Sequence, residues 1–407
     1  MHRSHNQKHN ERQMRSKSVV HVTTLGWSAK LFLLDHFNCL SRAGFETVLV
    51  CADDEDARRT VQATGVRFVP VPMRQNISPF ADCVSLFRLW RLFRLLRPTI
   101  VDAHMSKAGL LGSLAAWLAG VPIRIYHSHG MAVLSAHGWK YWLLWTTECL
   151  ACRLATEVIF VSNSNRHDIT SIGICPKERA VVLGPGTICG IDIDRFSAET
   201  ASQHGTKLRL QAGISPDSQI VGFVARIVPH KGIETILQAW HFLPVDIRAN
   251  AYLCLFGPYG DRRMKDLVKQ AVSEPESHVK YMGFVDNLPE WYPTMTLLVQ
   301  PSWHEGWGYN VLEAAACGVP AVGTRISGTV DAILDGQTGL LVPVKDPKAM
   351  ADAIARLLQD DRLRKSLGRA ARERAVNEFS KERICPLLTQ EYERLLGRTR
   401  IYEPQHA

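Results

Sequence analysis

The stretch SWHEGWGYNVLEAAACGVP, residues 302–320, joins a glycine-rich loop to a short apolar helix that ends at a Gly-Val-Pro sequence. Glycine suits the left-handed position after a helix, and proline prevents continuation of the helix. Free N–H groups and the positive end of the helix dipole near Gly308 favour an anionic ligand. Glu305 lies in the loop and Glu313 lies inside the helix. If the loop folds back, both carboxylates face one ligand.

This stretch lies between two short apolar runs, residues 297–300 and 321–324, as expected for one unit of an α/β sheet. The same alternation forms two series along the chain, and repeated βα units predict a doubly wound parallel sheet in each. The expected strands are residues 19–23, 46–51, 67–71, 100–103, 124–127 and 157–161 in the first series, and 219–225, 252–256, 279–282, 297–300, 321–324 and 339–343 in the second. One helix is expected near residues 30–43.

Glycine and proline gather between the two series, in residues 184–190, and this composition indicates a linker. We therefore expect an N-terminal Rossmann-like domain over residues 18–186 and a C-terminal one over residues 187–379. The polar, basic residues 1–17 form an expected disordered lead-in without a signal peptide. A helix at about residues 380–397 is expected to pack back onto the first domain.

Composition limits the classes of function. The 407 residues, 46% of them hydrophobic, suffice for two ordinary domains. A formal charge of +9 favours an anionic partner, which could be a nucleic acid, an acidic membrane or a phosphorylated ligand. The basic residues are spread over helices without a stacking motif, which argues against a nucleic acid. The ten cysteines lack framework spacing and predict a reducing, cytoplasmic setting, with Cys149 and Cys152 as packing residues.

A pair of cations follows the first strand of the second series, in the segment ARIVPHKG, residues 225–232. Ligands of open α/β sheets bind at the carboxyl ends of the strands, so Arg226 and Lys231 would project toward a ligand. A guanidinium fork and a compact ammonium together suit a diphosphate. Neither series carries a G-x-G-x-x-G fingerprint after its first strand, which argues against a nicotinamide dehydrogenase.

The combined motifs resemble those of a known enzyme family. Arg226 with Lys231-Gly232, Gly257, Gly283-Phe284-Val285 and the Glu305 to Ala314 motif, in this order, resemble the family-4 retaining glycosyltransferases. These enzymes have the GT-B architecture, two Rossmann-like domains facing each other across a cleft. DAHMSKAGLLG at 102–112 and HSHG at 127–130 are similar to the capsular and exopolysaccharide branch, whose members extend sugars on polyprenyl-diphosphate carriers.

The resemblance implies a donor site for a nucleotide sugar, with UDP as the expected nucleotide. Its donor diphosphate would be bound by Arg226, Lys231 and the backbone N–H groups of Tyr309, Asn310 and Val311. Glu313 would accept hydrogen bonds from the ribose, and Gly257, Gly283 and Phe284 would lie on the nucleobase side. Glu305 would face the donor sugar, either stabilising positive charge or attacking as a nucleophile. No metal is expected for this chemistry.

The resemblance also implies an acceptor side in the first domain. His129 would lie near the donor sugar and the acceptor, because the strand before it is expected to end after His127 and free it to turn toward the ligand. Gly26 lies in the first loop. Ser106 is expected to cap a helix that starts at Lys107, where a carrier diphosphate could bind; a plain helix cap is the alternative.

Two further segments suggest contact with an anionic membrane surface. Residues 84–97 place four arginines on about half of a helix whose remainder is mostly apolar, although an ordinary helix with a wet basic face fits equally well. The aromatic run at residues 139–145 suits either a membrane interface or core packing.

The leading hypothesis is a cytoplasmic, peripheral membrane glycosyltransferase at the inner face of the plasma membrane. It would move a sugar, with retention, from a nucleoside-diphosphate sugar to a polyprenyl-diphosphate-linked saccharide in capsule, exopolysaccharide or O-antigen type synthesis. A non-hydrolysing nucleotide-sugar epimerase and a non-catalytic sugar-nucleotide-binding membrane scaffold are the alternatives. No nucleic acid partner is expected.

Overall fold

A computed structural model describes residues 17–197 and 205–402 of the chain. The expected lead-in therefore lies outside the described residues apart from Lys17. The chain divides into two compact units: unit 1 ends at Gly190 and resumes at Glu382, whereas unit 2 covers Ile191–Lys381. The unit boundaries lie a few residues beyond the expected positions after residues 186 and 379.

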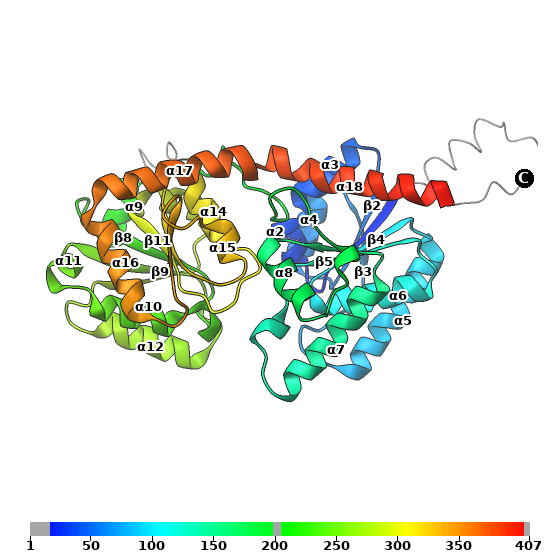
Figure 1. Cartoon of the computed structure of the whole chain (residues 1–407), viewed down its shortest axis with the longest axis horizontal. Coiled ribbons are helices and arrows are strands. Elements are labelled where there is room, and N and C mark those ends of the chain that lie inside the picture. The colour runs from blue at the N-terminus through cyan, green and yellow to red at the C-terminus, as the bar shows by residue number, and fades with distance from the viewer. Residues whose placement is uncertain (1–16, 198–204, 403–407) are drawn as a thin grey trace, which may run out of the picture. The chain divides into compact units, whose positions relative to one another are not determined.

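Unit 1 is built on a parallel sheet that, in its described residues, has seven strands in the order β3-β2-β1-β4-β5-β6-β7 (Figure 1). The strands are β1 (Ser18–Val22), β2 (Glu46–Cys51), β3 (Arg67–Pro70), β4 (Ile100–His104), β5 (Ile123–Ser128), β6 (Glu157–Phe160) and β7 (Ala180–Val182). Six of them match the predicted runs. The edge strand β7 escaped prediction because it has only three residues and follows the charged turn Lys177–Arg179.

Helices cover both faces of this sheet. They are α2 (Gly26–Phe32), α3 (Leu34–Arg42), α4 (Glu55–Thr64), α5 (Pro79–Leu96), α6 (Ser106–Leu118), α7 (Trp139–Leu154), α8 (Asn163–Ser171) and α18 (Lys381–Tyr402). The single helix expected at 30–43 is wrong: it is two helices, because Leu33 ends α2 and begins α3.

The last helix, α18, completes one of the apolar cores of unit 1. Its residues Leu388, Tyr392 and Leu395 are buried together with Val19 of β1 and Ile100 of β4. Figure 1 shows α18 (red) running along unit 1. The C-terminal segment is therefore an integral part of unit 1.

Unit 2 contains a second parallel sheet, which in the described residues has six strands in the order β10-β9-β8-β11-β12-β13. They are β8 (Gln219–Val224), β9 (Ala251–Phe256), β10 (Val279–Gly283), β11 (Leu297–Gln300), β12 (Ala321–Thr324) and β13 (Gly339–Val342), all close to the predicted runs. Its helices are α9 (Gly205–Gln211), α10 (Ile233–Phe242), α11 (Val245–Ala249), α12 (Arg262–Ser273), α13 (Leu288–Trp291), α14 (Tyr309–Ala316), α15 (Thr329–Ala332), α16 (Pro347–Gln359) and α17 (Asp361–Phe379).

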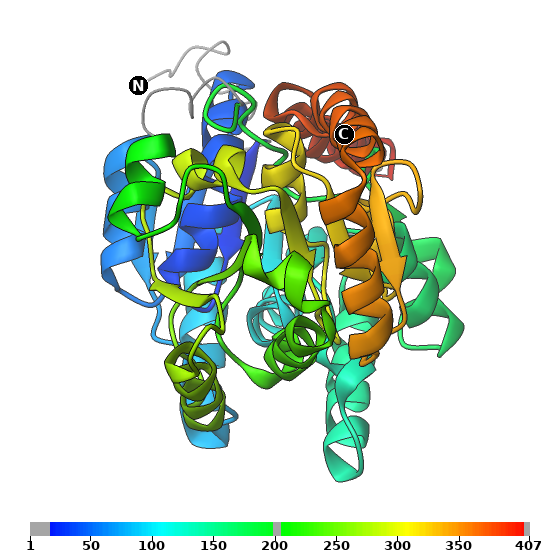
Figure 2. The same cartoon turned by 90° about the vertical axis from the view of Figure 1, so that its left-hand side faces the viewer.

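The core of unit 2 lies mainly between this sheet and helices α10, α12 and α16. Figure 2 turns unit 2 toward the viewer and shows α16 (orange) beside the strands. Both sheets are doubly wound, as the sequence predicted. Among the described residues, no helix combines the length and apolarity needed to cross a bilayer.

Candidate active site

The start of α14 lies at the carboxyl end of β11, where the predicted donor site was expected. Gly308 caps this helix with a φ of 102°, a backbone conformation that residues other than glycine rarely adopt. A Cβ at this position would approach the Gln300 amide to 3.0 Å. The glycine therefore lets the loop turn tightly over the end of β11.

The loop does fold back, and it places Glu305 against Lys231. The Lys231 ammonium lies 2.6 Å from Glu305 Oε1, and the Ser302 hydroxyl donates to the same oxygen at 2.7 Å. The backbone N–H of Trp303 donates to His230 O at 2.8 Å and ties the loop after β11 to the turn after β8. Two segments far apart in sequence thus form one polar surface.

Glu305 is ionised in this setting. Burial by itself would raise the pKa of Glu305, but the Lys231 ammonium and the hydrogen bond from Ser302 hold it below its ordinary value. The sequence had assigned Lys231 to the diphosphate and Glu305 to the sugar. The structure shows that these two charges already neutralise each other, so a ligand has to share Lys231 with Glu305.

Arg226 is the exposed cation of this surface. It follows β8, and its guanidinium makes no hydrogen bond or ion pair with another residue that the structure describes. The neighbouring His230 is exposed at the surface, but partial desolvation of its ring and the nearby Lys231 and Arg226 charges lower its pKa. Burial also lowers the pKa of His304. Neutral histidines beside two cations leave the surface suited to a phosphate group.

Glu313 lies on α14 beside Tyr292, which precedes β11. The Tyr292 hydroxyl donates to Glu313 Oε2 at 2.5 Å. Burial raises the pKa of Glu313 to about 7, against the opposing effects of this hydrogen bond and of Arg195. Its carboxyl group therefore changes charge near physiological pH. Tyr292 and Arg195 were missed by the sequence analysis because neither belongs to a recognisable motif.

The predicted N–H cradle at the start of α14 is partly occupied by the protein itself. Val311 N–H donates to Asn310 Oδ1 at 3.1 Å and to Gly308 O at 3.0 Å. The Asn310 amide donates to Val224 O at 3.0 Å and fastens α14 to the end of β8. In this structure the Val311 N–H already has acceptors within the protein, and the Asn310 side chain positions the helix.

Of the three residues expected on the nucleobase side, Gly257 and Gly283 are joined by a backbone hydrogen bond and Phe284 is exposed. Gly257 has a φ of 134°, and a Cβ there would come within 2.0 Å of Ala225 O, so this glycine allows β8 and β9 to converge beside Arg226. The Gly257 N–H donates to Gly283 O at 2.7 Å. Phe284 is 71% exposed and can cover a flat ligand.

His129 lies at the carboxyl end of the unit 1 sheet, directly after β5. The strand ends at Ser128, as predicted, so His127 stays buried with 2% exposure while His129 is half-buried. The ring of His129 packs against Phe32 at a centroid distance of 4.8 Å. Its Nε2 lies 3.3 Å from Nδ1 of His104.

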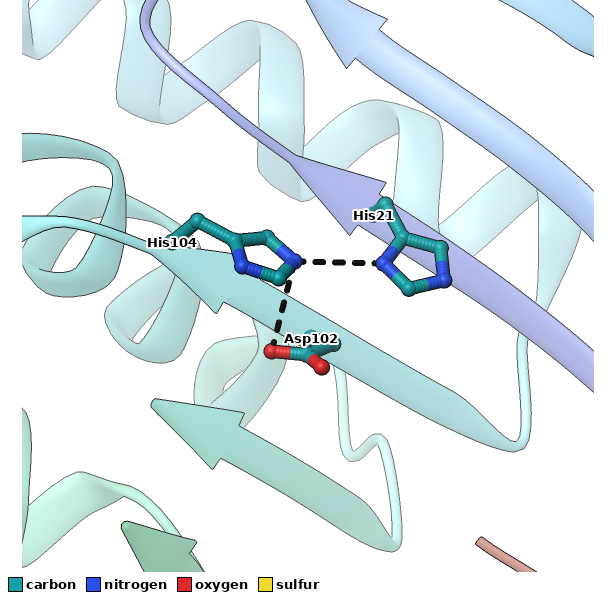
Figure 3. Close-up of side chains that lie close together, drawn as sticks. All are labelled: His21, Asp102 and His104. Atoms are coloured by element: carbon teal, nitrogen blue, oxygen red, sulfur yellow. Dashed lines mark hydrogen bonds and ion pairs between the residues drawn. The ribbon is translucent and has the colours of Figure 1, made fainter. Parts of the chain in front are cut away.

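A buried cluster of histidines and one aspartate surrounds His104. Figure 3 shows His21 of β1 with Asp102 and His104 of β4, whose ligating atoms all lie within 4.8 Å of one another. Two imidazoles and a carboxylate form a donor set that a divalent metal such as zinc can accept. The sequence analysis missed this cluster, although the side chains share one sheet face: His21 is the register partner of Asp102, and His104 that of His127.

The three residues expected on the acceptor side have different local surroundings. Ser106 is the first residue of α6, and the capping position is taken by Met105 in a left-handed conformation without a side-chain cap, so the expected cap is wrong. The Lys107 ammonium is paired with Asp82 at 2.7 Å. The Gly26 N–H is bound by Asp54 at 2.8 Å. Polar groups of the protein already satisfy Lys107 and Gly26.

Two protein families match the chain, one in each unit. Residues 32–186 match the family described as glycosyl transferase 4-like domain, and residues 206–374 match glycosyl transferases group 1. The chain is 29% identical over 383 residues to the capsular polysaccharide biosynthesis glycosyltransferase CapM of Staphylococcus aureus, covering 94% of this chain and 98% of that protein. It is 25% identical to the Escherichia coli UDP-Gal:alpha-D-GlcNAc-diphosphoundecaprenol alpha-1,3-galactosyltransferase, covering 85% and 88% of the two chains.

A solved structure shows the same fold. Anabaena Alr3699/HepE in complex with UDP and glucose superimposes with a TM-score of 0.78 at 20% identity, covering 93% of this chain and 100% of that one. The protein is therefore a glycosyltransferase of the GT-B fold. It belongs to the predicted family-4 glycosyltransferases and is similar to their capsular polysaccharide branch.

Proposed function

We propose that the chain transfers a sugar, with retention, from a UDP-sugar to a polyprenyl-diphosphate-linked saccharide during capsule, exopolysaccharide or O-antigen type synthesis. The observation that carries the proposal is the Lys231–Glu305 pair beside Arg226 at the carboxyl edge of the unit 2 sheet, with Glu313 on α14, which begins at the same edge. The names of the relatives support the substrate class, since the E. coli relative is named for a UDP-sugar and a lipid diphosphate.

In the proposed reaction, Arg226 and Lys231 bind the diphosphate. Negative charge grows on this leaving group as the glycosidic bond breaks, and fixed cations stabilise that transition state more than the ground state. These two cations supply the charge that a metal supplies in other transferases, so we propose chemistry without a metal. Glu313, once deprotonated, accepts hydrogen bonds from the ribose hydroxyls.

Glu305 acts in this proposal as an electrostatic stabiliser. Its Oε1 is held by Lys231 and Ser302, and a carboxylate so bound is a weaker nucleophile than a free one. The negative charge it keeps can still stabilise an oxocarbenium-like sugar. His129 contacts a substrate hydroxyl from unit 1.

The proposed membrane contact uses α5 and α7 of unit 1. The arginines of α5 at positions 88, 91 and 94 are exposed, and Phe80 at the start of the same helix is 85% exposed. On α7, Trp139 and Trp142 are 69% and 64% exposed, whereas Tyr141 and Trp145 of the same run pack against a core of unit 1. Exposed arginines and large aromatic rings suit an anionic lipid interface at the inner face of the plasma membrane, where a lipid-linked acceptor resides.

The direct test incubates the protein with a panel of radiolabelled nucleotide sugars and a bacterial membrane lipid extract. We expect label from one UDP-sugar to enter the organic phase, and we expect Lys231→Ala to abolish the transfer. Conversion of the donor in the absence of any lipid would instead indicate the epimerase. No reaction with any donor would contradict the enzymatic proposal.

A further inference from the structure

A chain of polar contacts leads from the C-terminal helix to His129. The Tyr392 hydroxyl of α18 donates to Asp102 Oδ2 at 2.6 Å. Asp102 Oδ1 lies 3.6 Å from His104 Nε2, and His104 Nδ1 lies 3.3 Å from His129 Nε2. Tyr392, Asp102 and His104 are each at most 1% exposed. The three side chains that connect His129 to the C-terminal helix are therefore shielded from water.

His104 and His21 are buried, and burial disfavours the charged form of an imidazole. A neutral imidazole carries one N–H, so each ring has one donor and one acceptor nitrogen. Which nitrogen of His129 can act on a ligand thus depends on where His104 carries its hydrogen.

The carboxylate of Asp102 decides the position of the hydrogen on His104. His104 Nε2 faces both Asp102 Oδ1, at 3.6 Å, and His21 Nδ1, at 3.2 Å. Figure 3 shows both interactions meeting at this nitrogen. If Nε2 carries the hydrogen, its positive end points toward two acceptors. If Nε2 is bare, its lone pair faces a buried anionic oxygen.

The two arrangements differ in what faces the buried anionic oxygen. Neither gives Asp102 Oδ1 or His21 Nε2 a hydrogen-bond partner among the described residues. With the hydrogen on His104 Nε2, an N–H with its positive end faces Asp102 Oδ1 at 3.6 Å, whereas with Nε2 bare a lone pair faces the same oxygen. A buried carboxylate attracts the N–H and repels the lone pair, so the first arrangement is favoured.

The position of the hydrogen on His129 follows from its position on His104. With its hydrogen on Nε2, His104 offers a lone pair at Nδ1, so the bond between His104 and His129 uses the hydrogen of His129 Nε2. His129 Nδ1 is then a bare acceptor. The other groups facing this chain, His127 with its Nδ1 3.5 Å from Asp102 Oδ2 and His21, do not touch His129 Nε2.

We propose that Asp102, held by Tyr392 of the C-terminal helix, fixes the tautomers of His104 and His129 so that His129 presents its Nδ1 lone pair to a substrate hydroxyl. Asp102, His104 and Tyr392 are positioning residues in this arrangement. The identity of the hydroxyl as part of a sugar rests on the proposed function, whereas the tautomers do not.

The tautomers can be measured without substrate by nitrogen NMR of protein labelled with ¹⁵N-histidine, assigned with His129→Gln and His104→Gln. We expect His129 protonated at Nε2 and bare at Nδ1. In Asp102→Asn the amide can donate to His104 Nε2, which should shift both rings toward the opposite tautomer. His129 protonated at Nδ1 in the wild type, or unchanged in Asp102→Asn, would overturn the proposal.

A milder variant guards against misfolding. Tyr392→Phe keeps the buried ring and removes only the hydroxyl, and we expect it to give a mixture of His129 tautomers. The matched control is Tyr126→Phe, which removes the hydroxyl that binds Glu148 at 2.7 Å in the same unit and should leave the His129 signals in place. Unchanged His129 signals in Tyr392→Phe would exclude the role of α18.

Two further measurements distinguish a failure of the tautomer proposal from a failure of the proposed function. Once a donor and acceptor are known, Asp102→Asn should lower kcat by about 10²-fold, at the lower end of the contribution of a positioned proton acceptor, with the KM for the donor unchanged. Absence of transfer by the wild type would reject the proposed function and leave the NMR result standing. One equivalent of zinc in the purified protein would overturn the tautomer proposal, because the metal would take the His104 Nε2 lone pair.

Discussion

The polar site of unit 2 and the histidine cluster of unit 1 occupy equivalent edges of two similar sheets, but they are built differently. In unit 2, charged side chains lie on loops and are partly accessible, and the Lys231 and Glu305 charges balance across 2.6 Å. In unit 1, the polar side chains lie on the strands themselves and are buried, with His129 alone half-exposed. The first arrangement can bind and release an anion, whereas the second can only orient one ring.

This difference predicts that substitutions in unit 2 have the largest effects. Lys231→Ala should lower kcat by about 10³-fold, because it removes a cation from the leaving diphosphate. It also removes the cation that balances the charge of Glu305, so the melting temperature should fall as well. Steady-state kinetics and thermal melts measure both effects. Lys348→Ala, which breaks an exposed ion pair on α16, is the matched control, and an equal loss there would contradict the assignment.

In unit 1, His129→Gln should lower kcat by about 10²-fold and leave the affinity for UDP unchanged. The physical reason is that the His129 ring orients a hydroxyl and does not bind the nucleotide. The measurement is a comparison of kcat with the dissociation constant of UDP. Loss of UDP binding in His129→Gln would contradict the claim that His129 does not contribute to nucleotide binding.

The pKa of Glu313, about 7, predicts a pH effect confined to the donor. Ribose hydroxyls need the deprotonated carboxylate as an acceptor, so the KM for the donor should rise as the pH falls below about 7. Glu313→Gln should weaken donor binding by about tenfold above pH 7, by less at lower pH, and remove this dependence. A pH series of KM values for both proteins tests the prediction, and the same pH dependence in Glu313→Gln would assign it to another group.

The same shift also predicts a stability effect. Because the folded pKa lies above the ordinary value of 4.5, the folded protein binds more protons between pH 4.5 and about 7, and its stability falls as the pH rises through this window. Glu313→Gln should flatten the fall in the free energy of unfolding. Denaturant titrations at several pH values provide the measurement, and an unaltered slope would contradict burial of the carboxyl group.

The smallest expected effect concerns the membrane surface. The double reversal Arg88→Glu with Arg91→Glu on α5 should weaken binding to anionic vesicles by at least about tenfold, since each basic residue contributes about 1 kcal/mol. Vesicle sedimentation with phosphatidylglycerol measures this. The charge-matched control is Arg262→Glu with Lys269→Glu on the exposed face of α12. Equal loss in both variants would indicate a general charge effect and not a defined surface.

The sequence predicted the strands well because buried parallel strands are short, β-rich runs between helices, as at residues 46–51 and 297–300. It predicted one helix at residues 30–43 because the apolar pattern continues through Leu33, whose backbone conformation alone separates α2 from α3. Local pattern cannot show such a change of direction. It also cannot show the left-handed Met105 that replaces the expected cap at Ser106.

The motifs located the charged residues of unit 2, but not their pairing. The contact between Lys231 and Glu305 depends on how the loops after β8 and β11 meet, which no spacing within either loop reveals. The contacts of the histidine cluster were harder to predict from the sequence. Tyr392 reaches Asp102 across 290 residues of sequence, through a helix that the sequence only suggested would return to the first unit.

Calorimetric titration of UDP into the purified chain tests the central claim most directly, namely that unit 2 holds the nucleotide and unit 1 orients the reacting group. We predict that one UDP binds per chain, that Arg226→Ala and Glu313→Gln weaken it, and that His129→Gln and Asp102→Asn leave its affinity unchanged. No binding by the wild type, or weaker binding in the two unit 1 variants, would contradict the claim.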